Sequence, residues 1–135
     1  MNRFTATLAA TGVLLAMVGT ASAQDANKGK SVFNQCKACH QLDKALVGPP
    51  LKGLIGRKAG SVEGYSYSPL MKAAGDAGLT WNQEELVGYL KNPTDYLKQY
   101  VSSKGKTATG SSKMVYMLAN EDQRKNVVAY LAEQK

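Results

Sequence analysis

The chain has 135 residues and a formal net charge of +7, which suits one domain with a modest core. This basic balance favours an acidic partner, whether nucleic acid, anionic lipid or an acidic protein face. The sequence predicts no nucleic-acid binding, because it has no basic run with interleaved aromatic residues. Two cysteines and one histidine also fall short of the four Cys or His ligands of a structural zinc site.

Residues 1–23 have the pattern of a secretory signal peptide. Arg3 lies in a short basic start, an apolar segment runs from Leu8 to Val18, and small residues end the pattern at Ala21-Ser22-Ala23. We expect cleavage after this point and export to the periplasm. No segment is long and apolar enough to span a bilayer, so we expect a soluble protein without stable membrane insertion. The remaining residues, 24–135, are predicted to form a single domain; they include 16 basic and 10 acidic residues, a net charge of +6.

A first helix is predicted from the Asp25 cap to about Gln35. Val32 and Phe33 belong to an apolar stripe at helical spacing. Gly29 inside this helix costs about 1 kcal/mol relative to alanine, which indicates a close backbone approach by another element. A weak, frayed helix is the alternative interpretation.

The motif Cys36-Lys37-Ala38-Cys39-His40 follows directly. Two thiols three positions apart lie about one helical turn from each other, so they can form thioethers to both vinyl groups of one porphyrin. His40 would then be the proximal iron ligand. A zinc half-site and a thioredoxin-like dithiol share the C-x-x-C spacing, but we find no second half-site and no convincing strand run. The motif therefore predicts one covalently bound haem c.

A loop rich in glycine and proline is expected from Val47 to Gly60. Pro49 fixes the backbone there and has no N–H, so its own carbonyl or a neighbouring one could accept the His40 Nδ1–H. Pro49 would also form a wall beside the imidazole. As an ordinary turn proline it would have no such role.

Polar groups suited to a haem propionate occur beyond this loop. Hydroxyls cluster in residues 64–68, which include Tyr67, and Arg57 and Trp81 add N–H donors. Each of these residues alone fits ordinary surface or core equally well, so the prediction rests on the group.

Further helices are predicted from cap and periodicity signals. They run from Ser68-Pro69 to near Gly75, from Asn82 to Lys91, from Thr94 to about Val101, and from the Asn120 cap to about Gln134. A surface loop, residues 102–112, separates the last two.

With these features in place, residues 25–135 resemble a class I cytochrome c, of the bacterial periplasmic c-two type that is similar to mitochondrial cytochrome c. The matches occur in the family's order: Gly29 and Phe33, C-K-A-C-H at 36–40, G-P-P-L at 48–51, G-R-K at 56–58, Y-S-Y at 65–67, Trp81, Tyr89, N-P at 92–93, K-M at 113–114 and A-Y-L at 129–131. The resemblance implies an all-α cytochrome c fold with four to five helices around one covalently bound haem.

The resemblance also implies roles for individual residues. Cys36 and Cys39 would hold the haem, His40 and Met114 would be the axial iron ligands, and Pro49 would buttress His40. Around them, the resemblance places Arg57, Tyr67 and Trp81 near the propionates, Tyr89 near the Met114 sulfur, and Gly29, Phe33 and Tyr130 at a crossing of the first and last helices.

Three methionines follow residue 23, namely Met71, Met114 and Met117. We expect Met114 to be the sixth ligand, held by Ser112 and Tyr116, with Tyr89 donating to its sulfur. Met71 resembles a propionate-side position, where the family often has an asparagine. Met117 is expected to be flexible core filler beneath the last helix, and it is the alternative candidate for the sixth ligand. The chain also departs from the short mitochondrial form by an expected insertion at residues 99–111.

These expectations indicate a one-electron carrier and not an enzyme, because two protein ligands leave no open position on the iron. A peroxidase-like haem enzyme or a ligand-binding haem protein is the alternative. The expected partners are acidic faces of membrane redox complexes: a cytochrome bc-type complex, a photosynthetic reaction centre or a terminal oxidase. We expect a monomer that is steered to these partners by lysines such as Lys113.

Overall fold

The computed structural model describes residues 24–135, so the predicted signal peptide at 1–23 lies outside the described residues. This part of the chain forms five α-helices and no strand, with one isolated bridge between Lys58 and Thr80. The helices are α1 (Ala26–Phe33), α2 (Pro69–Asp76), α3 (Gln83–Lys91), α4 (Pro93–Ser103) and α5 (Glu121–Ala132). None of them is long and apolar enough to cross a membrane. The predicted all-α fold is confirmed.

Each helix begins at a polar side chain that accepts a backbone N–H from three residues further on. The predicted caps Asp25, Ser68 and Asn120 are all present. Asn82, expected as the first residue of its helix, instead caps α3. The start predicted for α4 is one residue late. Asn92 caps this helix by accepting the Asp95 N–H, and Pro93 occupies the first helical position, which tolerates proline because its N–H would have no helical partner.

The helix ends differ slightly from the predictions. α1 ends at Phe33 and α5 at Ala132, each two residues earlier than expected. α4 instead continues to Ser103, so the first residues of the expected 99–111 insertion are helical. Gly105, with φ of 70°, then takes the left-handed conformation that commonly follows a helix end.

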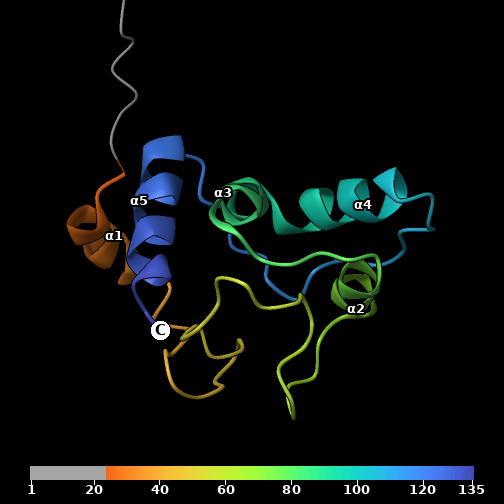
Figure 1. Cartoon of the computed structure of the whole chain (residues 1–135), viewed down its shortest axis with the longest axis horizontal. Coiled ribbons are helices and arrows are strands. Elements are labelled where there is room, and N and C mark those ends of the chain that lie inside the picture. The colour runs from red at the N-terminus through yellow and green to blue at the C-terminus, as the bar shows by residue number, and fades with distance from the viewer. Residues whose placement is uncertain (1–23) are drawn as a thin grey trace, which may run out of the picture.

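The crossing of α1 and α5 is the most extensive helix–helix contact in the described chain (Figure 1). A Cβ on Gly29 would lie 1.9 Å from the Asn126 carbonyl oxygen, so only glycine fits at this point. The rings of Phe33 and Tyr130 pack beside it, with centroids 5.3 Å apart. The crossing predicted at these three residues is confirmed, and it explains the glycine inside α1.

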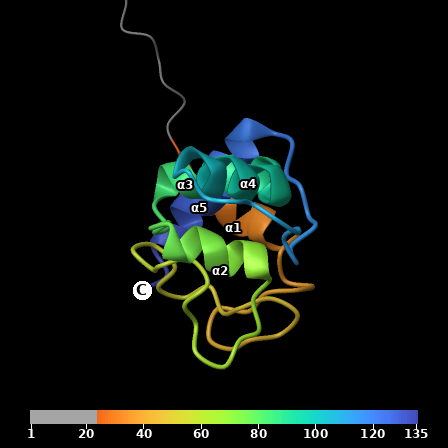
Figure 2. The ribbon, with the colours of Figure 1, turned by 90° about the vertical axis from the view of Figure 1, so that its right-hand side faces the viewer.

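The other helices join this pair through α3. α3 packs against α5 and α4, and α2 packs against α4 (Figure 1). The long loops between α1 and α2 fill the side of the molecule below α2 (Figure 2). Gly75 lies inside α2 where a Cβ would be 2.1 Å from the Ala59 carbonyl oxygen, so it brings this helix against the loop. Its position in the sequence had indicated only a helix end.

Candidate functional site

One cavity of about 440 Å³ lies between the helices and the loop that follows α1. This volume is within the range of cofactor and small-molecule pockets. Most of its lining is apolar, including Leu51, Leu54, Leu86 and Leu131. All ten predicted site residues line it: Cys36, Cys39, His40, Pro49, Arg57, Tyr67, Trp81, Tyr89, Ser112 and Met114. The fold therefore gathers residues separated by up to 78 positions around one space.

The two cysteines lie on a turn that continues from the end of α1. The Cys36 N–H donates to the Phe33 carbonyl, and the Cys39 and His40 N–H groups both donate to the Cys36 carbonyl. This tight turn directs both side chains to the same cavity. The thiols are not joined in a disulfide, and burial raises the pKa of Cys36, with a further contribution from nearby Cys39. The pair is available for two separate thioether bonds.

His40 is oriented by the loop predicted to buttress it. Its Nδ1 lies 2.9 Å from the Pro49 carbonyl oxygen, and since a carbonyl can only accept, Nδ1 carries the proton. That tautomer leaves the Nε2 lone pair free to bind a metal. Burial lowers the pKa of His40, although the Pro49 hydrogen bond acts in the opposite direction, so the neutral ring is favoured. Neutral imidazole is the form that ligates metal ions.

Gly48 forms a surface on which the His40 ring packs, and a wall formed by the Pro49 ring stays a prediction. A Cβ at Gly48 would lie 2.3 Å from His40 Cε1, so the imidazole packs directly on the Gly48 backbone. The Pro49 carbonyl accepts the hydrogen bond from His40 Nδ1, and the absence of a side chain at Gly48 leaves room for the His40 ring. The G-P-P-L sequence contained a signal for this role, since a glycine before a rigid proline pair often permits a close approach.

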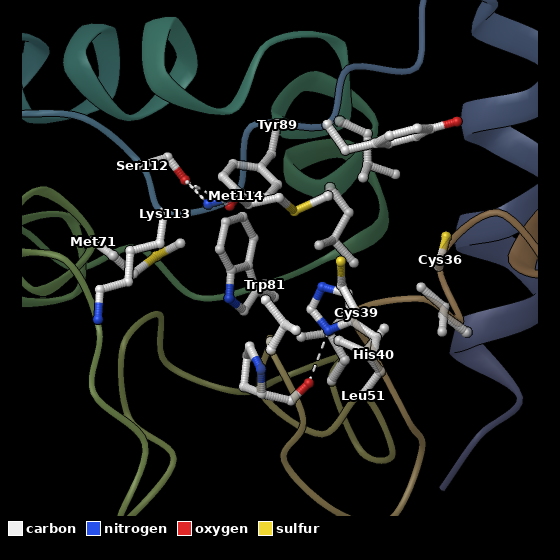
Figure 3. A pocket seen from close by; sticks show the side chains of 18 of the residues that line it. Cys36, Cys39, His40, Leu51, Met71, Trp81, Tyr89, Ser112, Lys113 and Met114 are labelled. Carbon is white, nitrogen blue, oxygen red and sulfur yellow. Dashed lines mark hydrogen bonds between the residues drawn. The ribbon is translucent and has the colours of Figure 1, made fainter.

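Met114 enters the cavity from the segment between α4 and α5. Figure 3 shows its side chain above the His40 ring, with the Cys39 and Cys36 sulfurs to one side and Trp81 to the other. The Met114 N–H donates to Ser112 Oγ at 3.1 Å, and the Ser112 N–H donates to Thr94 Oγ1 at 3.0 Å. Buried Ser112 thus connects Met114 to α4.

Tyr89 is placed differently from the expectation in one respect. Its hydroxyl pairs with Ser112 Oγ at 3.3 Å and not with the Met114 sulfur. Burial raises the pKa of Tyr89 to about 12, so the phenol is neutral at ordinary pH and can donate. Tyr89 therefore supports Met114 through Ser112.

The residues expected on the propionate side also line the cavity, each with a different environment. The Arg57 guanidinium donates to the carbonyls of Pro50 and Lys52 at 2.7 and 2.5 Å, and burial lowers its pKa. The Tyr67 hydroxyl accepts the Val62 N–H at 3.3 Å. Trp81 is buried, with its ring centroid 4.9 Å from that of Tyr89. A direct contact with propionates stays a prediction for all three.

The structure separates the three methionines. Met71 is buried and lines the same cavity as Met114. Met117 does not line it and is 58% exposed, so the expectation that it is core filler is wrong. Its neighbour Leu118 is the buried residue, because the Leu118 N–H donates to the Leu90 carbonyl and turns the Leu118 side chain inward.

The donor set fits a covalently bound haem. Two thiols, a histidine with a fixed tautomer and a thioether share one mostly apolar cavity, and these are the groups that c-type attachment and His/Met ligation use. Within residues 24–135, no three His, Cys, Asp or Glu side chains are placed to share a metal ion directly.

Comparison with known proteins agrees with this site. The cytochrome c family model matches residues 26–135. A cytochrome c2 of Rhodopseudomonas palustris is 56% identical over 114 residues, covering 83% of this chain and all of the relative. Cytochrome c2 iso-1 of Rhodospirillum centenum is 49% identical over 112 residues, covering 79% of this chain and 93% of the relative.

Solved structures show the same relationship. The structure of ferricytochrome c2 from Rhodopseudomonas palustris superposes with a TM-score of 0.82 at 51% identity, covering 83% of this chain and 100% of that one. Cytochrome c2 from Paracoccus denitrificans superposes with a TM-score of 0.72 at 32% identity, covering 83% and 97%. The chain belongs to the cytochrome c family, as a class I member of the c2 type with one haem c held through Cys36 and Cys39.

Proposed function

We propose that this chain is a periplasmic one-electron carrier and not an enzyme, with His40 and Met114 as the two axial ligands of its haem iron. The supporting observation is that one cavity holds both thiols, the oriented imidazole of His40 and the thioether of Met114. When bound, haem c supplies a one-electron iron couple. His40 and Met114 would both bind the iron and leave no position open, which would disfavour activation of a small molecule there.

Residues of the chain would then set the reduction potential of the iron and shield it from water. The Pro49 carbonyl holds the Nδ1 proton of His40 and raises the basicity of the ligating nitrogen. A thioether from Met114 raises the reduction potential relative to a second imidazole. Ser112 fixes the backbone of Met114, and the apolar lining around both excludes water.

The proposed partners are membrane redox complexes with acidic faces: a cytochrome bc-type complex, and a photosynthetic reaction centre or terminal oxidase. The net charge of +6 on residues 24–135 supports this, because opposite charge increases the encounter rate of proteins that bind only briefly. The signal pattern at residues 1–23 supports export to the periplasm. We propose that the carrier acts as a monomer.

Substitution of each methionine tests the ligand assignment. In oxidised protein, Met114→Ala should abolish the weak long-wavelength absorption of Met–iron ligation and lower the reduction potential. Met71→Leu keeps the volume of the other cavity methionine, and Met117→Ala changes the exposed one, so both should retain the band. Loss of the band in either control, with its retention in Met114→Ala, would disprove the assignment. A high-spin spectrum of the parent would instead favour the peroxidase-like alternative.

A further inference from the structure

The segment 112–118, which carries Met114, is anchored by its backbone only near its two ends. The Ser112 N–H donates to Thr94 on α4, and the Leu118 N–H donates to the Leu90 carbonyl at the end of α3 at 2.9 Å. Between them, residues 115–117 make no backbone–backbone hydrogen bond with any part of the described chain. Their side chains are largely exposed, up to 83% at Val115. The position of this stretch therefore depends on side-chain contacts.

Two side chains close to Met114 reach opposite rims of the cavity. The Lys113 ammonium donates to the Ser66 carbonyl, in the loop before α2. The Tyr116 hydroxyl donates to Oε1 of Gln35, the residue directly before Cys36. Tyr116 and Gln35 both line the cavity. The second contact therefore joins the segment of the proposed sixth ligand to the haem attachment motif, across 81 positions of sequence.

We propose that Tyr116 and Gln35 are positioning residues whose hydrogen bond sets how often the Met114 segment opens away from the cavity. This inference rests on the proposed role of Met114 as a ligand. Opening of the segment breaks few other hydrogen bonds, because residues 115–117 have no backbone partners in the described chain. Besides the proposed bond from Met114 to the iron, opening breaks the contact of Lys113 with Ser66. The hydrogen bond between Tyr116 and Gln35 therefore contributes a large fraction of the free energy that keeps the segment closed. The same bond contributes only a small fraction of the free energy of global unfolding.

Imidazole binding to the oxidised holoprotein reports this opening, because imidazole reaches the iron only when the Met114 sulfur has left. If opening is a rapid pre-equilibrium, the binding rate is proportional to the open fraction. Tyr116→Phe removes only the hydroxyl and should speed binding about two- to tenfold, the range expected for one hydrogen bond. Gln35→Leu should have the same effect. The double variant should be no faster than either single variant, because both remove the same bond.

A control variant separates local opening from a general loss of stability. Asp25→Ala removes the cap of α1 and lowers global stability. The hydrogen bonds of Asp25 go to Lys28, Gly29 and Asn126 and not to residues 112–118. Asp25→Ala should leave the imidazole rate unchanged. Amide hydrogen exchange gives a second readout that does not depend on the iron: peptides covering 112–118 should exchange faster in Tyr116→Phe, and not in Asp25→Ala.

The outcomes separate the two claims. An imidazole rate in Tyr116→Phe equal to that of the parent overturns the proposal, as does equal acceleration by Asp25→Ala or simple additivity in the double variant. If Met114 is not the ligand, the parent and Met114→Ala have the same Met–iron absorption, or both lack it, and they bind imidazole at the same rate. That result refutes the proposed function and leaves the hydrogen-exchange comparison as the test of Tyr116 and Gln35.

Discussion

Replacing Gly29 by alanine tests how tightly α1 and α5 cross. In the structure, the added Cβ would lie 1.9 Å from the Asn126 carbonyl oxygen and 2.9 Å from Tyr130 Cβ. The first obstacle is backbone inside a helix, so it cannot rotate aside. Ordinary contact begins at 3.4 Å, so the helices must separate by about 1.5 Å at this point. The packing of Phe33 on Tyr130 would loosen with them.

The expected loss of stability is a balance of two effects. Overpacking of a rigid contact costs about 3 kcal/mol, the upper part of the usual range, because no side chain can yield. Alanine returns up to about 1 kcal/mol through its better helix propensity. The net loss should be about 2 kcal/mol, or a fall in melting temperature of roughly 8 °C for a domain of this size.

Thermal and denaturant unfolding of the holoprotein, followed by far-ultraviolet circular dichroism, measures this loss. Gly88→Ala in α3 is the matched control, because it gains the same helix propensity and the atoms nearest to its Cβ belong to the Tyr96 ring, from 2.9 Å. A ring edge can turn aside, so the control should stay within about 1 kcal/mol of the parent. The reasoning is refuted if Gly29→Ala is as stable as Gly88→Ala.

Three further predictions follow from the site and the charge. Denatured protein should stay red after acid-acetone extraction and have the mass of residues 24–135 plus one haem; a colourless extracted protein contradicts thioether attachment, and a mass including 1–23 contradicts cleavage. The pKa of Tyr89 is about 12 in the folded state against 10.0 ordinarily, so stability that is complete below pH 10 should fall by about 2 to 3 kcal/mol as the pH rises towards 12. Urea unfolding should show a smaller alkaline loss in Tyr89→Phe, and equal losses would refute the burial argument. Electron-transfer rates with an acidic partner should fall as salt rises through about 0.1 M, and fall less steeply in Lys113→Gln, whereas a salt-independent rate would exclude steering.

Local sequence determined the helices and the chemistry of attachment. Asn82 caps α3 by accepting a hydrogen bond from an N–H only three residues away, and the C-x-x-C-H motif spans about one helical turn. Both features operate over a few residues, so any chain with this sequence tends to form them. Composition also limits the choice of a histidine ligand for the haem iron, because His40 is the sole histidine. Even Gly29 indicated a close approach, since nothing local favours glycine inside a helix.

Tertiary structure decided which distant groups meet inside the cavity. Tyr89 pairs with Ser112 and not with the Met114 sulfur, and the Tyr116 hydroxyl reaches Gln35. Several hydroxyl and amide groups compete for each such donor, and the choice depends on the relative placement of whole segments. Propensity and spacing carry no information about that placement.

The same distinction explains why the prediction for Met117 was wrong. The apolar side chain of Met117 suits a core, but the hydrogen bond from Leu118 to Leu90 fixes the direction of the chain and leaves Met117 in solvent. The packing of the His40 ring on the Gly48 backbone likewise becomes evident only in the folded structure. The sequence by itself determined the helices, their caps and the attachment chemistry, whereas burial and van der Waals contact at each position became defined only when the whole chain had packed.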